Sequence, residues 1–382
     1  MTLYDYIIVG AGASGLMLAD ALGKDPFFAD KSILLLDKEK KQENDRTWCF
    51  WETGDTRFKE VIYKNWNQIF FAGKVYSNHF KLTPYSYKMV RGDHFYVNYL
   101  ERIRNYPNIS LALETVTEVK DKSSHVEITT STSSYHAKKV FNSAFDYKAL
   151  LNQNKYPVLQ QHFLGWFIKT AQPIFNPDQA TFMDFSIPQK GNTRFMYVLP
   201  TSTTEALIEY TLFSKEVLST SEYEDGLKAY MKDHLNCEEY EITAYEKGNI
   251  PMSCFNFNSY NTSNVMHIGI SGGWAKPSSG YTFMHSYKKV QKLIPFLKKE
   301  QPLNKFGKRN RFWFYDLLLL DILHRDNSKG QLIFEQLFKN QRPQKIFKFL
   351  DEETNLWEDL QIIAACPKKE FILALIRRII KF

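Results

Sequence analysis

The order of apolar and polar positions over the first forty residues predicts a strand, a helix and a second strand. Residues 4–9 form an apolar run of β type, residues 16–22 are good helix formers, and residues 32–36 form a second apolar run. The first strand and the helix are joined by a segment with three glycines, Gly10-Ala11-Gly12-Ala13-Ser14-Gly15. The second strand ends at Asp37, 22 residues after Gly15. This order is typical of a βαβ unit that binds a dinucleotide.

Each glycine of this segment has a distinct expected role. Gly10 allows the tight turn, Gly12 lets a pyrophosphate approach the backbone, and Gly15 lets the helix pack closely on the strand. The N-terminus of the helix offers free N–H groups to the phosphates, and Asp37 can accept hydrogen bonds from an adenosine ribose. The alternative is a tight strand–helix turn that binds nothing.

The pattern of apolar and polar residues differs between the later regions of the chain. Residues 44–95 are loop-rich and aromatic, and the region that follows predicts one helix and three strands, at 96–105, 116–121, 125–130 and 135–141. Residues 155–245 alternate as an antiparallel sheet does, with four short strands and a helix at 163–170, 180–185, 193–200, 206–212 and 222–235. A short apolar strand at 265–270 leads into a second glycine cluster, and from residue 281 onward the pattern is helical and charged.

This order predicts an α/β protein with a Rossmann-like dinucleotide-binding fold, an inserted antiparallel-sheet domain and a C-terminal helical region. We expect the cofactor domain to be discontinuous, since the late apolar strand returns to it after the insertion. The expected boundaries are 1–150 and 246–300 for the cofactor domain, 151–245 for the substrate-binding sheet, and 301–382 for the helical region.

Composition narrows the possible partners and the compartment. The 382 residues carry 49 Lys and Arg against 42 Asp and Glu, a net charge of +7 that is spread along the chain. This favours anionic cofactors or a membrane surface over nucleic acid, which would require a concentrated basic patch. The four cysteines are far apart, which argues against a disulfide framework or a zinc site and for a reducing compartment.

The chain is expected to be cytoplasmic and not integral to a membrane. A strand that begins at Tyr4 leaves no room for a signal peptide, and no apolar run approaches the ~18 residues of a spanning helix. Aromatic residues make up 15% of the chain, which fits either a bulky core or a tunnel for a long, flat, apolar ligand.

The second glycine cluster provides a second candidate for cofactor binding. Its glycines let the backbone approach a flat ring or a phosphate; they are Gly269, Gly272, Gly273 and Gly280. The alternative is an ordinary junction between a strand, a loop and a helix.

Three segments together resemble the lycopene cyclase family of flavoproteins, in particular the bacterial lycopene β-cyclases and their plant relatives. They are the first glycine motif, Asp45-Arg46-Thr47-Trp48-Cys49-Phe50-Trp51, and Lys276-Pro277-Ser278-Ser279-Gly280-Tyr281-Thr282-Phe283. The resemblance implies that both glycine clusters hold FAD, kept reduced with the help of NAD(P)H. It further implies isomerisation of the linear ψ-ends of lycopene to β-ionone rings, giving γ-carotene and β-carotene in carotenoid biosynthesis without net redox change.

That reaction requires an acid, a base, π-rich or negative surroundings for a carbocation, and exclusion of water. Glu209 is the expected catalytic carboxyl, because it lies in the apolar run 206–212, where an unused and unpaired charge would be costly. It also matches the essential glutamate of the family's L-I-E-D-T or F-L-E-E-T motif. Tyr210 stands where relatives carry a second acid, so the resemblance supplies no second carboxylate here. The alternative for Glu209 is a solvent-facing strand residue.

Residues 349–354 (FLDEET) look like the same motif but lie within a helical pattern. We expect Asp351, Glu352 and Glu353 to begin a helix, where acids suit the helix dipole, and not to act in catalysis.

The remaining candidates are basic and aromatic. Arg46 and Arg91 are candidates for the FAD pyrophosphate or ring edge, the alternative being surface ion pairs. The expected lining of a polyene tunnel is aromatic, with core packing as the alternative; the candidates are Trp48, Trp274 and Tyr281, with Trp51 and Trp166. Residues 368–382 are apolar and basic, which fits an interfacial helix on an anionic membrane or a terminal helix docked on the core.

Two other functions fit the same flavin fold, which also includes aromatic hydroxylases and geranylgeranyl reductases. One is an FAD-dependent monooxygenase or a reductase of isoprenoid double bonds. The other is a flavin- and carotenoid-binding protein without catalytic activity.

Overall fold

The computed structural model describes residues 3–54 and 57–381 and contains three sheets with helices packed around them. The first sheet has the order β8-β2-β1-β11-β10-β9, with β17 beside β11. Its strands are β1 Leu3–Val9, β2 Ile33–Asp37, β8 Ile109–Leu113, β9 Val116–Asp121, β10 Val126–Thr130, β11 Ser134–Asn142 and β17 Val265–His267. The strands on either side of β1 are parallel to it, and the β9–β10 hairpin extends the sheet antiparallel.

The βαβ start forms because its strands are apolar on both faces. Ile8 of β1 packs towards α1 (Ala13–Lys24), α2 (Gly92–Arg104) and α5 (Phe283–Leu297), and Ile7 packs on the opposite face with β10 and β11. β17 pairs parallel with β11, so residues 265–267 return to the sheet that residues 3–9 begin. The predicted Rossmann-like α/β class is confirmed.

The second sheet has the order β16-β12-β15-β14-β13-β5-β6. Its strands are β5 Gln68–Ala72, β6 Ser77–Lys81, β12 Val158–Thr170, β13 Gln179–Asp184, β14 Thr193–Pro200, β15 Glu205–Ser214 and β16 Tyr240–Ser253. The long strands β16, β12, β15 and β14 are antiparallel neighbours, whereas β5 runs parallel to β13. This sheet therefore draws strands from residues 68–81 and 240–253 as well as from the predicted antiparallel region.

A third sheet, β3-β7-β4, contains β3 Thr47–Thr53, β4 Ile62–Trp66 and β7 Tyr85–Arg91. Residues 44–95, which we expected to be loop-rich, thus supply five strands, β3 to β7. The expectation was wrong because these strands mix polar and aromatic residues without clean alternation, and β3 and β4 pair with β7 rather than with a strand next to them in sequence.

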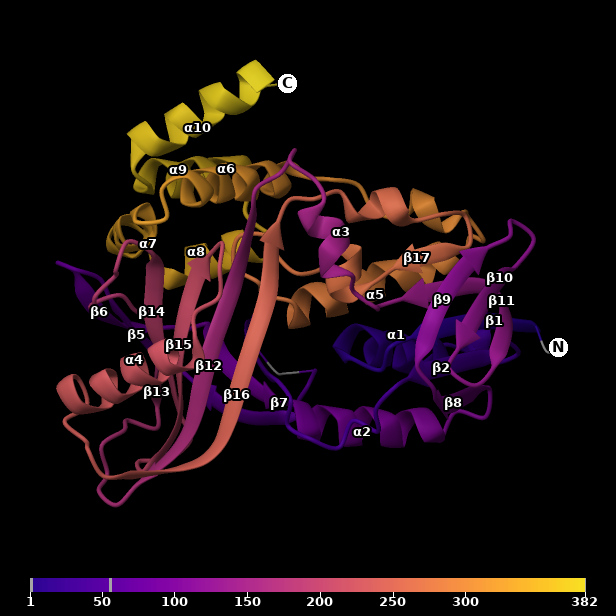
Figure 1. Cartoon of the computed structure of the whole chain (residues 1–382), viewed down its shortest axis with the longest axis horizontal. Helices are drawn as coiled ribbons and strands as arrows, with labels where there is room; N and C mark the ends of the chain where they lie inside the picture. Colours follow the sequence, from indigo (N-terminus) through magenta and orange to yellow (C-terminus); the bar gives the residue numbers. More distant parts are fainter. Residues whose placement is uncertain (1–2, 55–56, 382) are drawn as a thin grey trace.

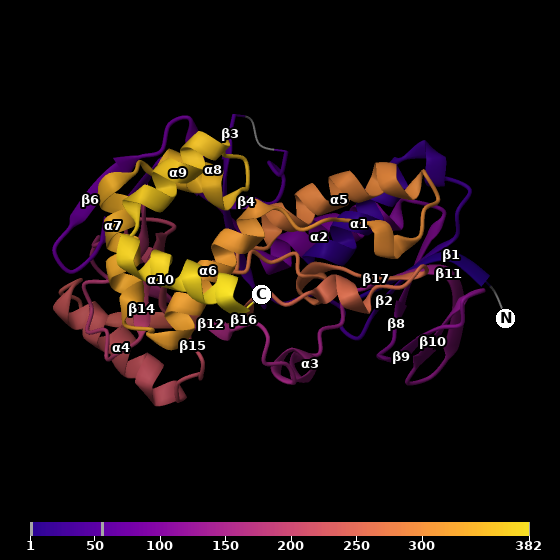
Figure 2. The same cartoon turned by 90° about the horizontal axis from the view of Figure 1, so that it is seen from above.

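Helices cover both faces of the second sheet. One face packs on α4 (Thr220–Asp233), and the other packs on α6 to α8 (Figures 1 and 2). The remaining helices are α3 Tyr147–Leu151, α6 Arg311–Arg325, α7 Lys329–Asn340, α8 Pro343–Leu350, α9 Leu356–Ala365 and α10 Lys368–Lys381, with 3₁₀ turns η1 Pro26–Phe28, η2 Phe257–Tyr260, η3 Gly269–Gly272 and η4 Leu303–Lys305. Figure 1 shows α9 and α10 on the outside of this helical layer.

Asp351, Glu352 and Glu353 end a helix instead of beginning one, which corrects the sequence prediction. Asp351 is the C-cap of α8, and Glu352 has a left-handed backbone with φ 63°. The next helix, α9, begins only after Asn355, which forms a capping box with Glu358. A local capping signal four residues further on therefore defines the helix start, and the three acids are held by lysines described below.

Candidate active site

The three glycines between β1 and α1 differ in what surrounds them. Gly10 has φ +96°, and a Cβ there would lie 2.0 Å from Oγ of Ser143. A Cβ on Gly15 would lie 1.9 Å from the carbonyl oxygen of Gly10, so α1 packs directly on the turn. A Cβ on Gly12 would meet no described atom within 4 Å. Two glycines are therefore required by packing, and the second leaves the backbone open to an approaching group.

Asp37 holds this turn from the end of β2. Its Oδ2 accepts the Ala11 N–H at 2.5 Å, and its Oδ1 accepts the Glu39 N–H at 2.8 Å. Gly12 is the N-cap of α1, and this helix start has no side-chain cap hydrogen bond within the described part of the chain. Free amides at a helix N-terminus, beside a backbone open to approach, fit the pyrophosphate of a dinucleotide.

The second glycine cluster lies beside the same end of α1. A Cβ on Gly269 would be 3.0 Å from Oγ of Ser14, which lies in the first turn of α1, and the Ser14 hydroxyl is 2.8 Å from that of Ser286 in α5. Gly272 and Gly273 close the η3 turn that follows β17. Gly280 lies further along, against Gln161 of β12, and borders the cavity described next.

Arg46 and Arg91 lie at adjacent ends of β3 and β7, where Thr47 pairs with Arg91. Arg46 has a 58% exposed side chain, lies 3.6 Å from Asp45 and lines the cavity. Arg91 is half-buried and pairs with Asp93 at 3.1 Å, and its guanidinium covers the ring of Tyr63. The two arginines therefore lie near one another, with Arg46 facing the cavity.

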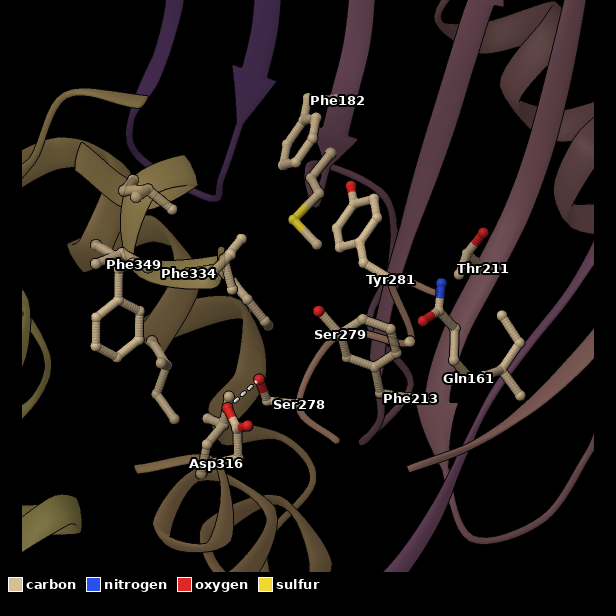
Figure 3. Close-up of a pocket in the computed structure, with 18 of the residues that line it drawn as sticks. Gln161, Phe182, Thr211, Phe213, Ser278, Ser279, Tyr281, Asp316, Phe334 and Phe349 are labelled. Atoms are coloured by element: carbon tan, nitrogen blue, oxygen red, sulfur yellow. Dashed lines mark hydrogen bonds between the residues drawn. The ribbon is translucent and has the colours of Figure 1, made fainter. Parts of the chain in front are cut away.

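A cavity of about 420 Å³ lies between the second sheet, the C-terminal helices and the loop that contains residues 278–282. This size is within the range of small-molecule pockets. Figure 3 shows aromatic side chains from both walls, with Phe182 and Phe213 on the sheet side and Phe334 and Phe349 on the helical side. The lining is mostly apolar, and its charged members within the described chain are Arg46, Glu209 and Asp316.

Glu209 is the carboxyl of this lining that has no hydrogen-bond or ion-pair partner among residues 3–54 and 57–381. Successive residues of β15 point to opposite faces, so Leu207 and Phe213 pack towards the C-terminal helices while Ile208 packs towards α4. Glu209 shares the first of these faces, is 7% exposed, and makes no hydrogen bond or ion pair with the described residues. Burial raises its pKa well above the usual value, and the charge of Glu246 adds to this. Glu209 therefore keeps its proton to a higher pH than an exposed glutamate does.

Tyr210, by contrast, points to the other face of the sheet. Its hydroxyl accepts a hydrogen bond from Arg194 Nη1 at 2.8 Å, and its ring packs near Tyr223 of α4. The position where relatives carry a second acid therefore faces away from the cavity in this chain.

Tyrosine hydroxyls gather beside Glu209. Tyr197 lies directly opposite Glu209 on β14, and its hydroxyl contacts that of Tyr87, which lies 3.3 Å from the hydroxyl of Tyr281. Burial raises the pKa of all three phenols, so they remain neutral hydrogen-bonding groups. Tyr197 and Tyr281 line the cavity, whereas Tyr87 lies in the core behind them. Tyr281 was predicted from its motif, but no local signal distinguishes Tyr197 from a core tyrosine.

The aromatic residues predicted to line a tunnel divide into those that line the cavity and those that are buried in a core. Trp48 and Tyr281 line the cavity. Trp274 is 4% exposed, packs in the core around α1 and α5, and is not among the lining residues. Trp51 and Trp166 are also buried in cores, Trp51 stacked on Phe347 and Trp166 on the α4 side of the sheet. The placement of Trp274 thus gives it no contact with this cavity.

A buried charge cluster fastens the glycine-rich loop to the helices. The Lys276 ammonium is fully buried and lies 2.8 Å from Asp316 and 3.3 Å from Glu352. Ser278 donates to Asp316 at 2.6 Å, as the dashed line in Figure 3 shows. Glu353 and Asp351 pair with Lys288 of α5. The acids of residues 351–353 therefore anchor α8 against the loop and α5, and Asp316 is neutralised at the cavity wall.

The fold and this site define a class of proteins with a dinucleotide-binding α/β domain and an apolar pocket beside it. The chain is similar to a geranylgeranyl bacteriochlorophyll reductase-like protein from Thermoplasma acidophilum, at 10% identity and TM-score 0.65, covering 97% of this chain and 98% of that one. It is also similar to a flavoprotein/dehydrogenase from Cytophaga hutchinsonii, at 13% identity and TM-score 0.62, covering 100% and 99%. The halogenase PltM in complex with phloroglucinol and FAD matches at 12% identity and TM-score 0.64, covering 97% and 86%.

The sequence itself decides the family within this fold. Residues 5–376 match the family described as lycopene cyclase protein, so the chain belongs to the lycopene cyclase family. No curated protein matches the chain by sequence.

Proposed function

We propose that this protein is a lycopene β-cyclase, which converts the ψ-ends of lycopene to β-ionone rings by acid–base isomerisation. The observation that supports this most directly is Glu209, a buried carboxyl that no described residue pairs with, on the wall of an apolar, aromatic cavity. Membership of the lycopene cyclase family gives the substrate class. A protonated carboxyl surrounded by π-faces is what carbocation chemistry in a water-poor pocket requires.

In the proposed reaction Glu209 donates its proton to C2 of the ψ-end. The C5–C6 double bond then attacks C1, the ring closes, and a tertiary cation forms at C5. A proton leaves C6 for the carboxylate, so the formula and the redox state of the substrate do not change. Rings such as those of Phe213 and Tyr281 line the cavity and can face the cation, and the apolar lining excludes water.

The glycine segments fit FAD, which family members use in reduced form with NAD(P)H as reductant. Gly12, the uncapped start of α1 and Asp37 would hold the pyrophosphate and ribose, because Gly12 alone of the first three glycines faces open space. Gly269 and its neighbours lie beside the same helix end. When bound in its reduced anionic form, this cofactor would supply negative charge that stabilises a nearby cation.

We further propose that the protein binds a membrane surface through an exposed apolar face on α9 and α10. Trp357 is 69% exposed and Ile380 77% exposed, and the other exposed apolar side chains of α9 and α10 are Leu356, Leu360, Ile372, Leu373, Leu375, Ile376 and Ile379. Single exposed apolar residues are ordinary, but this many on two consecutive helices indicate an interaction surface. No helix among the described residues is long and apolar enough to cross a membrane.

Two features connect this face to the cavity and to the proposed substrate. Ile372 lies both on the exposed face and among the residues that line the cavity, so the cavity wall reaches the surface there. Ala374 and Arg378 dock α10 on the protein, with Arg378 2.9 Å from Asp321 of α6, while exposed Lys368 and Lys369 begin the helix. A docked helix with an apolar outer face lets a bilayer-dissolved polyene reach the cavity without crossing water.

The function is tested by expressing the chain in cells that accumulate lycopene and analysing their pigments. γ-Carotene or β-carotene is expected from the wild type, and unchanged lycopene from Glu209→Gln, with FAD content equal in the two proteins. Oxygenated or saturated products would instead indicate a monooxygenase or a reductase. Unchanged lycopene with folded, FAD-loaded wild type would leave only a binding role.

A further inference from the structure

A row of side chains crosses four strands of the second sheet at the level of Glu209. On β14 the residue opposite Glu209 is Tyr197, and on β12 it is Gly165. Gly165 in turn pairs with Glu246 on β16. Directly opposed residues of antiparallel strands point to the same face, so Glu209 and Glu246 flank Gly165 on the cavity side of the sheet.

Gly165 creates the space between the two carboxyls. A Cβ at this position would lie 2.9 Å from Cγ of Glu209, closer than side chains normally approach. A glycine inside a long, well-paired strand weakens it, and such a residue marks a place where another group needs the room. Here that group is the Glu209 side chain.

Glu246 is held as a hydrogen-bond acceptor on both of its oxygens. The Thr47 N–H donates to Oε1 at 2.7 Å, and the Thr47 hydroxyl donates to Oε2 at 2.5 Å. Thr47 belongs to the segment 45–51 that resembles the lycopene cyclases, and Arg46 beside it favours the ionised form of Glu246. Glu246 is only 5% exposed, so its charge depends on these partners.

The environments of the two carboxyls therefore differ. Glu209 has no donor among the described residues, whereas Glu246 has two. Burial raises the pKa of both, and that of Glu209 rises further because of the charge on Glu246. When two nearby acids have such unequal surroundings, one ionises first and the other keeps its proton.

The other titratable groups around the pair do not change this assignment. The groups near Glu209 are Cys49 of β3 and two tyrosines, Tyr197 and Tyr281, all with raised pKa values and therefore neutral. Those near Glu246 are Cys49, Arg46 and Asp45. The charged groups of Arg46 and Asp45 lie 3.6 Å apart, so their opposite effects on Glu246 largely cancel.

We propose that Glu246 is a positioning residue that stays ionised and thereby keeps the proton on Glu209, with the gap at Gly165 bringing the two side chains onto one face. The second carboxylate that position 210 does not supply thus comes from a strand two places away in the sheet. The idea rests on the proposed function only in naming Glu209 as the acid for cyclisation. The carboxyl–carboxylate pair itself exists in the protein without substrate.

The test is an infrared titration of protonated carboxyls in the purified full chain with FAD present. Wild type is expected to show a protonated carboxyl band at neutral pH that Glu209→Gln removes. In Glu246→Gln the band should persist but titrate about one pH unit lower, the effect expected of one charge about two strand spacings away. Glu241→Gln, the same change at an exposed position of β16, is the matched control and should not shift the band.

Thr47→Val provides a second route if Glu246→Gln does not fold. It removes the hydroxyl donor to Glu246 and should raise the pH at which the first of the two carboxyls ionises. An unshifted band in Glu246→Gln, or a band lost in that variant and kept in Glu209→Gln, would overturn the proposal. If cyclisation is measurable, the pH at which its rate falls on the alkaline side should shift by the same amount as the titration of the infrared band. If lycopene is not a substrate, the titration still shows whether Glu246 raises the pKa of Glu209.

Discussion

Replacement of Gly12 by alanine should separate cofactor binding from folding. A Cβ at Gly12 would meet nothing within 4 Å, and the backbone there, at φ −77° and ψ −176°, is one that alanine adopts readily. Alanine is a poorer N-cap than glycine by up to about 1 kcal/mol. It also reduces the entropy of the unfolded chain, which stabilises by about 0.4–1 kcal/mol. The two effects oppose one another, so the free energy of unfolding of the apoprotein should change by less than about 1 kcal/mol.

Binding of FAD should respond very differently. The open space above Gly12 is where a pyrophosphate would approach the amides of α1, and a methyl group there would displace it. Loss of one charge-assisted hydrogen bond costs about 1.5–3 kcal/mol, which corresponds to roughly 10- to 100-fold weaker binding. Equilibrium titration of the apoprotein with FAD, followed by flavin fluorescence, measures this directly, and urea unfolding of the apoprotein measures stability.

Gly15→Ala is the matched control, because it is the same change three residues away. Its Cβ would lie 1.9 Å from the Gly10 carbonyl oxygen, a backbone atom that cannot move without shifting β1 or α1. We expect about 1–3 kcal/mol or more of destabilisation of the apoprotein. If Gly12→Ala bound FAD as tightly as wild type while remaining folded, the assignment of this turn to the pyrophosphate would be refuted.

Three further predictions follow from particular contacts. Lys276→Met should lower the free energy of unfolding by about 3–5 kcal/mol in urea titrations, since Asp316 is left buried without its cation, while Lys228→Met on the exposed face of α4 should change it little. The pKa of Glu209 is raised in the folded protein, so its contribution to stability is present at low pH and is lost as the pH rises from the unfolded-state pKa through the folded-state pKa. Glu209→Gln should flatten this decline in the free energy of unfolding. An unchanged dependence of that free energy on pH would contradict the assignment of Glu209 as a buried acid. The double variant Ile379→Ser/Ile380→Ser should sediment less with anionic vesicles at unchanged melting temperature, and equal sedimentation would exclude this face as the membrane contact.

The sequence predicted the parts of the fold whose signals are local. The run from β1 through α1 to β2, the β9–β10 hairpin and the strands of the antiparallel sheet follow from apolar runs, alternation and turn residues. The strands β3 to β7 were missed, since their residues are too mixed to alternate and only β5 and β6 pair as a local hairpin, whereas β3 and β4 pair with the later strand β7. Acids 351–353 were placed at the wrong end of a helix, because the αL turn at Glu352 and the capping box at Asn355 outweigh the acidic run.

Within the site, the sequence alone indicated the glycine segments and the family, and it singled out Glu209 as the candidate acid. It could not say which way Glu209 points, because apolar residues stand at both alternating sets of positions in residues 206–212 and both faces of β15 are buried. Sheet packing decided that Glu209 faces the cavity and Tyr210 faces α4. It also placed Trp274 in a core away from the cavity.

Glu246 illustrates the limit of local signals most clearly. It lies in a polar stretch of β16 where a charged residue looks solvated, and nothing near it in sequence marks it out. Only the register of β15, β12 and β16 places it across Gly165 from Glu209. A sequence motif can identify the residues that a backbone turn or a helix requires, because these requirements involve only neighbouring residues. The proton affinity of a buried acid depends on desolvation and on charges brought near it by distant strands, and these exist only in the folded chain.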